Sequence, residues 1–170
     1  MQARRRSPGH RSLVKGREGD VPELVMLEHS IEIEAPADHA WAIVADLGSY
    51  DSWNPFIVAA GGDTNPGGRL QITIRAGQRR PRTFTPTVID VQPGASIRWR
   101  GRLLVPGFFD GEHELRVDPI SDHRSRFTQQ EKFSGILVPL LGGLLADTER
   151  GFAEMNAALK HRVEGRGKAS

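Results

Sequence analysis

Two polar residues, His113 and Glu131, interrupt strand faces that are otherwise apolar, and they are the strongest candidates for chemistry in this chain of 170 residues. His113 shares the face of its predicted strand with Leu115 and Val117, and Glu131 shares its face with Phe127 and Phe133. If the two strands are hairpin neighbours, the imidazole and the carboxylate become cross-strand partners. Such a pair in an apolar pocket suits a general base and its orienting group, for an aldol cyclisation or a dehydration. The alternative is a hydrogen-bonded pair that anchors a ligand or lines the mouth of a cavity.

Gln129 shares the face of Glu131, where it either donates a hydrogen bond to a ligand carbonyl or faces water at the mouth of a pocket. Aromatic and aliphatic residues form a candidate wall for a flat or acyl ligand, although about half of the aromatic residues must serve as ordinary core. The residues expected to contribute to a ligand site or its wall are Tyr50, Trp53, Phe56, Ile74, Trp99, Phe109, Leu115, Phe127, Phe133, Leu144, Thr148 and Phe152.

Several chemistries are excluded or unsupported by composition and motifs. The chain has no cysteine, which excludes a disulfide scaffold, a thiolate zinc site, an iron–sulfur cluster and a cysteine nucleophile. Its six histidines show no metal-ligand spacing. No phosphate-binding loop and no Gly-x-Ser-x-Gly elbow is present. We therefore expect neither a metal nor a cofactor.

The positive charge is concentrated at the N-terminus. Residues 1–20 hold six basic and two acidic residues, while the rest of the chain holds 17 basic and 19 acidic residues. The body is thus slightly acidic, so nucleic-acid binding is not expected. The tail lacks the apolar stretch of a signal peptide, and the longest apolar run, 136–146, is too short to span a membrane. We expect a cytoplasmic protein without stable membrane insertion, and translation from either Met1 or Met26.

Hydrophobic periodicity predicts one strand, one or two short helices, about six further strands and one long helix. The first helix begins at Pro36, because a proline suits the first turn of a helix, and Gly48 is its expected stop. The predicted strands cover residues 27–34, 56–60, 70–75, 83–91, 97–103, 112–117 and 126–133, and the long helix covers 139–163. Pro86 suggests an edge or a bulge in the strand 83–91.

Consecutive hairpins imply an antiparallel sheet, and its apolar face must be covered. The C-terminal helix is the only predicted element long enough to cover it. We therefore predict an α+β fold in a single domain over residues 26–164, with a disordered basic tail over 1–25 and a frayed C-terminus over 165–170. The arginine cluster at residues 79–82 is predicted to be a solvated hairpin tip.

This order of elements resembles the START-like (SRPBCC) superfamily, and more closely its polyketide cyclase/dehydrase-type branch. The matching residues are Ile31-x-Ile33-x-Ala35-Pro36-Ala37, Trp41, Asp46, Tyr50, Trp53-Asn54-Pro55-Phe56, Trp99-x-Gly101, Pro106-Gly107, Gly111-Glu112-His113 and Phe133-Ser134-Gly135. The resemblance implies a helix-grip fold. In this fold a curved antiparallel sheet of about six to seven strands surrounds the long C-terminal helix, two short helices follow the first strand, and a cavity lies between sheet and helix.

The resemblance implies a small hydrophobic or amphipathic ligand (a lipid, a polyketide-like molecule or an aromatic molecule) in that cavity. The alternative is a metal-independent cyclase/dehydrase-type enzyme that uses His113 and Glu131. A third possibility is an interaction protein that acts through residues 1–25. A monomer or a homodimer is compatible with each of these, because fold alone does not determine function.

Overall fold

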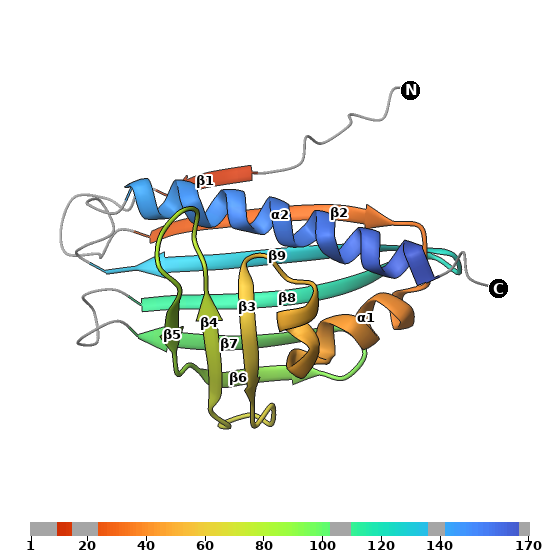
Figure 1. Cartoon of the computed structure of the whole chain (residues 1–170), viewed down its shortest axis with the longest axis horizontal. Coiled ribbons are helices and arrows are strands. Elements are labelled where there is room, and N and C mark those ends of the chain that lie inside the picture. Colours follow the sequence, from red (N-terminus) through yellow and green to blue (C-terminus); the bar gives the residue numbers. More distant parts are fainter. Residues whose placement is uncertain (1–9, 15–23, 103–109, 136–141, 167–170) are drawn as a thin grey trace.

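The computed structural model describes residues 10–14, 24–102, 110–135 and 142–166. Its main layer is an antiparallel sheet of six strands in the order β1-β2-β9-β8-β7-β6, and a second sheet has the order β3-β4-β5 (Figure 1). The strands are β1 (His10–Val14), β2 (Leu24–Ile33), β3 (Ile57–Gly62), β4 (Leu70–Ile74), β5 (Arg82–Phe84), β6 (Thr87–Gln92), β7 (Ser96–Arg102), β8 (Asp110–Ser121) and β9 (Arg124–Ser134).

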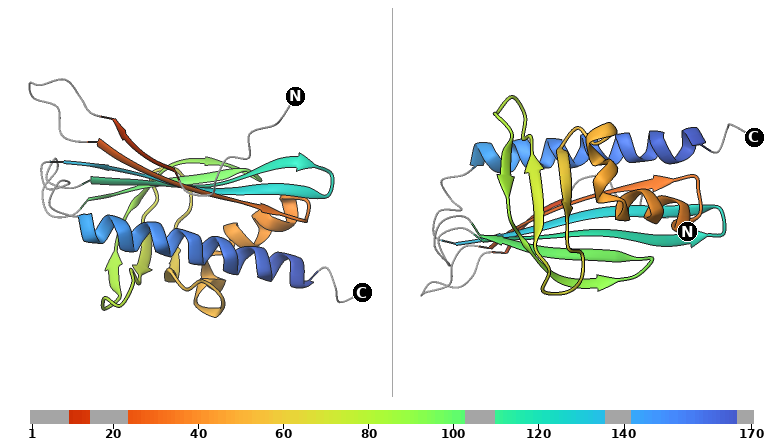
Figure 2. Two further views of the ribbon diagram at one scale, coloured as in Figure 1. Left: turned by 90° about the horizontal axis from the view of Figure 1, so that it is seen from above. Right: turned by 60° about the horizontal axis from the view of Figure 1, so that its bottom comes forward.

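The long helix α2 (Gly142–Arg166) lies along one face of the large sheet, and the small sheet stands on that same side (Figure 2). The helix side chains that pack inward have the predicted spacing. Phe152, Met155 and Leu159 are fully buried, and they belong to the same buried core cluster as Leu27 and Phe127 of the sheet. This arrangement confirms the predicted α+β helix-grip architecture.

Two short helical segments, α1 (Ala37–Ala45) and the 3-10 helix η1 (Leu47–Ser52), follow β2 at one end of the sheet. Pro36 is the N-cap of α1 rather than its first residue, α1 ends at Ala45, and the expected stop Gly48 lies inside η1. After η1 the side chain of Asn54 accepts hydrogen bonds from the backbone N–H groups of Phe56 and Ile57, at 3.0 and 2.9 Å. These bonds turn the chain into β3 and aim Phe56 at α2.

The prediction of one continuous strand over residues 83–91 was wrong, because this segment forms two strands that belong to different sheets. β5 pairs with β4 in the small sheet, whereas β6 pairs with β7 in the large one. Pro86 lies at the break, where it lacks an N–H for either ladder, while its carbonyl accepts a bond of 2.9 Å from the N–H of Leu70. The chain therefore leaves one sheet and enters the other at this proline.

Other boundaries also differ from the prediction. β8 and β9 extend beyond the predicted strands 112–117 and 126–133, and leave a tight turn between Ser121 and Arg124. β1 pairs antiparallel with β2 inside the segment predicted to be a disordered tail. The motif residues 106–107 and the predicted helix start at 139–141 lie outside the described residues.

Candidate functional site

A cavity of about 130 Å³, partly open to solvent, lies where the small sheet, strands β7 to β9 and the first half of α2 meet. Most of its lining is apolar. The lining residues are Phe56, Ile57, Ile72, Ile74, Ala76, Phe84, Pro86, Trp99, Gly101, Gly111, His113, Glu131, Phe133, Leu144 and Thr148. The fold thus places eight of the predicted site and wall residues around one space, and these are His113, Glu131, Phe56, Ile74, Trp99, Phe133, Leu144 and Thr148.

His113 and Glu131 face each other across β8 and β9, as the hairpin prediction required. The Nδ1 atom of His113 is hydrogen-bonded to Oε2 of Glu131. Because an ionised carboxylate only accepts, we assign the hydrogen to Nδ1. The two side chains are 5% and 13% exposed, so the pair is almost removed from bulk water. A buried, charge-assisted bond of this kind fixes both groups at the cavity wall.

Two aromatic rings fix the plane of the His113 imidazole. The indole of Trp99 stacks on it, with ring centroids 4.9 Å apart and planes 8° apart. Phe152 meets it edge-on, at a centroid distance of 5.2 Å and an angle of 86°. Phe152 in turn packs edge-on against Phe56 at 5.6 Å. The Nε2 atom of His113 is buried and has no hydrogen-bond partner among the described residues.

Several residues predicted for the ligand site lie in the core or at other places in the fold instead of lining the cavity. Leu115 and Phe127 are completely buried in the core. Phe152 lies behind His113, and Trp53 packs edge-on against Tyr50 at 5.0 Å, away from the cavity. Phe109 lies outside the described residues.

Tyr50 is a structural residue at the α1–η1 corner. Its hydroxyl donates a hydrogen bond of 2.6 Å to the carbonyl of Val44, and the side chain is fully buried. Burial raises the pKa of the Tyr50 hydroxyl, with a smaller contribution from the nearby Asp46 carboxylate. The hydroxyl is therefore neutral and engaged in the fold.

Gln129 belongs to a separate buried cluster between β9, β2 and α2. Its amide N–H donates to Oδ1 of Asn156 at 2.6 Å and to the carbonyl of Phe152 at 3.3 Å. The amide of Asn156 donates to Nδ1 of His29 at 2.9 Å. Burial lowers the pKa of His29, against an opposing effect of Glu149, which favours the neutral ring that this bond requires. Gln129 thus joins α2 to the sheet and lies outside the cavity.

Some lining residues were not predicted from the sequence, namely Ile57, Ile72, Ala76, Phe84, Pro86, Gly101 and Gly111. Alternation offered a signal for three of them. Ile72 shares a strand face with Ile74, Gly101 lies two residues from Trp99, and Gly111 lies two residues from His113. Each therefore points the same way as a predicted residue. The others come mainly from the small sheet, which was not recognised as a separate sheet.

The predicted hairpin tip at residues 79–82 contacts α2 through one arginine. The Nε atom of Arg79 lies 2.9 Å from Oδ2 of Asp147, near the start of the helix. Arg150 lies 3.5 Å from the other oxygen of the same carboxylate. The ion pair joins the β4–β5 hairpin to α2 beside the lining residue Leu144. Within the described part of the chain, no helix is both long and apolar enough to cross a membrane.

Comparisons with known proteins agree with this architecture. The Zhui aromatase/cyclase from a Streptomyces species superposes with a TM-score of 0.72 at 19% identity, over 86% of this chain and 98% of that one. A START superfamily protein from Mycobacterium smegmatis gives 0.64 at 21% identity, over 83% and 98%. Truncated norcoclaurine synthase from Thalictrum flavum gives 0.65 at 15% identity, over 86% and 97%. At these identities the likeness shows the fold alone. No curated protein matches the sequence.

The sequence model of one family, described as polyketide cyclase/dehydrase and lipid transport, matches residues 25–164. This match covers β2 through nearly all of α2, and so includes every element that lines the cavity. The chain therefore belongs to the polyketide cyclase/dehydrase and lipid transport family.

Proposed function

We propose that this protein binds a small, flat, mostly apolar molecule in the cavity between the small sheet, the large sheet and α2. The observation that carries the proposal is the combination of an apolar cavity with one buried polar pair, His113 and Glu131, in its wall. Apolar pockets with a few placed polar groups are the common form of small-molecule sites. The family description and the aromatase/cyclase neighbour agree with a ligand of this type.

The size of the cavity limits the buried part of the ligand. An apolar cavity of about 150 Å³ accommodates a benzene ring, and the cavity here is of about 130 Å³. One aromatic ring, or an acyl segment of similar volume, would fill it, while the rest of the ligand extends through the open side. Burial of that ring contributes roughly 25 cal/mol for each Å² of apolar surface removed from water.

Filling the cavity from within tests this proposal. Leu144→Trp introduces an indole at the lining, whereas Leu24→Trp makes the same change at a half-buried leucine that does not line it. We expect the wild type and Leu24→Trp to bind naphthalene equally in a fluorescence titration, and Leu144→Trp to bind it at least roughly tenfold more weakly. Equal binding by the two variants would contradict the proposal.

A second candidate function, a cyclisation or dehydration of a polyketide-like substrate, is supported by the same buried pair. A carboxylate with an imidazole fixed beside it is equipped to remove a proton next to a carbonyl group and to return it to a developing alkoxide. The chemistry needs the pair, whereas binding depends mainly on the apolar wall.

The two functions separate in variants of the pair. If the protein is an enzyme, His113→Ala and Glu131→Gln abolish turnover of a poly-β-ketone probe while naphthalene still binds. If it is a binding protein, the wild type converts the probe no faster than the uncatalysed blank. Liquid chromatography of the probe, with the uncatalysed cyclisation as the blank, distinguishes these outcomes.

A further inference from the structure

The carboxylate, and not the imidazole, is the part of the polar pair that is available to a ligand. His113 Nε2 is buried, and Nδ1 is engaged by Glu131. The Glu131 side chain keeps more than twice the exposed fraction of His113, and it lines the cavity. Its Oε2 is bonded to the imidazole, which leaves Oε1 as the oxygen that the imidazole does not engage.

A glycine makes the space that Oε1 occupies. Gly111 precedes His113 by two residues on the same face of β8, and it also lines the cavity. A Cβ atom at Gly111 would stand 2.7 Å from Oε1, closer than such atoms approach each other. Any larger residue at this position must displace the carboxylate. The absence of a side chain at Gly111 therefore keeps Oε1 at the cavity wall.

We propose, on the basis of the proposed function, that Oε1 of Glu131 accepts a hydrogen bond from a hydroxyl group on a neutral, flat ligand, and that His113 is a positioning residue for that oxygen. An ionised carboxylate only accepts hydrogen bonds, so a ligand group facing Oε1 must donate one. The N–H of His113 already offsets part of the carboxylate's charge. The other polar lining side chain, Thr148, donates its hydroxyl hydrogen to the carbonyl of Leu144. The ligand is thus recognised by a hydroxyl donor at Oε1 of Glu131 and by its flat apolar shape along the rest of the cavity wall.

Three naphthalene probes test this recognition in the full chain. 2-Naphthol donates a hydrogen bond, 2-methoxynaphthalene only accepts one, and naphthalene does neither. We expect the wild type to bind 2-naphthol roughly tenfold more tightly than either of the others, because hydrogen bonds to charged groups are the strong class. In Glu131→Gln the amide oxygen faces His113, so the amide N–H₂ replaces Oε1. The preference for 2-naphthol over 2-methoxynaphthalene should then fall at least roughly fivefold.

A pair of glycine variants isolates the position of the carboxylate. Gly111→Ala displaces Oε1, whereas Gly101→Ala, directly opposite on β7, adds the same methyl group with only an ordinary contact of 3.9 Å to Pro86. Both glycines line the cavity. Each variant therefore loses the volume of one methyl group, and we expect the affinity for naphthalene to fall equally in both. We expect only Gly111→Ala to lose the preference for 2-naphthol over naphthalene, so that the ratio of the two affinities falls toward one.

Two variants of His113 test its positioning role. The amide of Asn places a donor near the position of Nδ1, so His113→Asn should keep at least half of the 2-naphthol to naphthalene ratio. His113→Leu removes the donor and should lose the ratio. A purely structural role would move both affinities together and leave the ratio unchanged in each variant. Thermal unfolding of every variant verifies that it is folded.

The outcomes distinguish this inference from the function on which it rests. Equal affinity of the folded wild type for all three probes overturns the hydroxyl recognition and leaves binding in the cavity intact. Tighter binding of a naphthylmethylammonium ion than of 2-naphthol also overturns it, because the ligand is then cationic. Failure of every probe to bind the wild type overturns both the inference and the proposed function.

Discussion

The rings of Trp99 and His113 lie parallel, 4.9 Å apart at an angle of 8°, across the β7–β8 ladder that puts the two residues in register. Phe152 closes the arrangement from α2, nearly perpendicular to the imidazole. The imidazole is thereby held by the sheet on one side and by the helix on the other. Its orientation toward Glu131 is a property of the core, which links the stability of the fold to the geometry of the site.

Removal of the Trp99 indole should destabilise the fold and remove one of the two rings that orient His113. Trp99 is buried, so we expect Trp99→Leu to lower the free energy of unfolding by about 2–4 kcal/mol. Trp41→Leu, at a half-buried position on α1, should cost distinctly less. Urea denaturation of the two variants measures this difference. An equal cost would show that Trp99 contributes no more than a peripheral tryptophan.

A second glycine allows close packing between α2 and the β3 region. A Cβ atom at Gly151 would stand 2.1 Å from Cδ2 of Phe56. We therefore expect Gly151→Ala to destabilise the protein by about 1–3 kcal/mol, the usual cost of overpacking. Gly165→Ala lies on the same helix with open space around it, and it should instead stabilise the protein by up to about 1 kcal/mol. The same sign for both variants in thermal unfolding would contradict this packing.

His29 makes the stability of the fold sensitive to mild acid. Its pKa is lowered in the folded state, so the unfolded chain binds the proton more readily. The stabilisation is present above the unfolded-state pKa of about 6.5 and is lost as the pH falls toward the lower folded-state value. We expect the free energy of unfolding to fall less between pH 7.5 and pH 5.5 in His29→Gln than in the wild type. An identical fall, measured by urea titration, would exclude this contribution.

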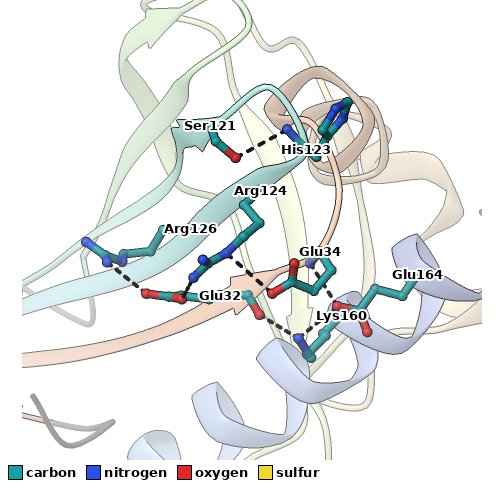
Figure 3. A network of polar contacts seen from close by, with 8 residues as sticks. All are labelled: Glu32, Glu34, Ser121, His123, Arg124, Arg126, Lys160 and Glu164. Atoms are coloured by element: carbon teal, nitrogen blue, oxygen red, sulfur yellow. Dashed lines mark hydrogen bonds and ion pairs between the residues drawn. The ribbon is translucent and has the colours of Figure 1, made fainter. Parts of the chain in front are cut away.

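An exposed ion-pair network joins β2, β9 and α2 near the C-terminal end of the helix (Figure 3). Glu32 accepts bonds from Arg124 and Arg126, and Nζ of Lys160 donates to its carbonyl at 2.7 Å. The hydrogen bonds from Arg126 and then Arg124 lower the pKa of Glu32. Its contribution to stability is therefore present above the unfolded-state pKa of the carboxyl and is lost as the pH falls through the folded-state value.

Salt should weaken this network, because its charges are exposed. We expect Glu32→Gln to lower the melting temperature slightly at low ionic strength and to have a smaller effect in 0.5 M NaCl, a concentration at which the screening length is on the order of a few Å. Glu154→Gln, at an exposed position with no ion pair among the described residues, serves as the control. An effect of Glu32→Gln that is independent of salt would contradict an electrostatic origin.

Alternation of apolar and polar residues predicted most of the fold. The strands that contain Ile33, Leu115 and Phe127 each bury one face, and the stripe from Leu145 to Val163 has helical spacing, so periodicity identified both layers. The division at Pro86 was not predictable in the same way. Residues on both sides of it have strand character, and only pairing with β4 or β7 assigns them to different sheets.

The candidate site was predicted where it depends on cross-strand register. His113 and Glu131 were expected to be partners, and the β8–β9 hairpin places them in register and bonded. The roles of Tyr50 and Gln129 were not apparent, because their partners, the carbonyl of Val44 and the amide of Asn156, are chosen by tertiary packing. The space that Gly111 leaves for Glu131 likewise appears only when the two strands are paired.

A crystal structure of the protein soaked with 2-naphthol tests the central claim most directly. We predict the naphthol ring in the cavity, between the small sheet and α2, with its oxygen within hydrogen-bond distance of Oε1 of Glu131. The bond between His113 and Glu131 should be preserved in that complex. A closed cavity with the probe bound elsewhere on the surface would contradict the account.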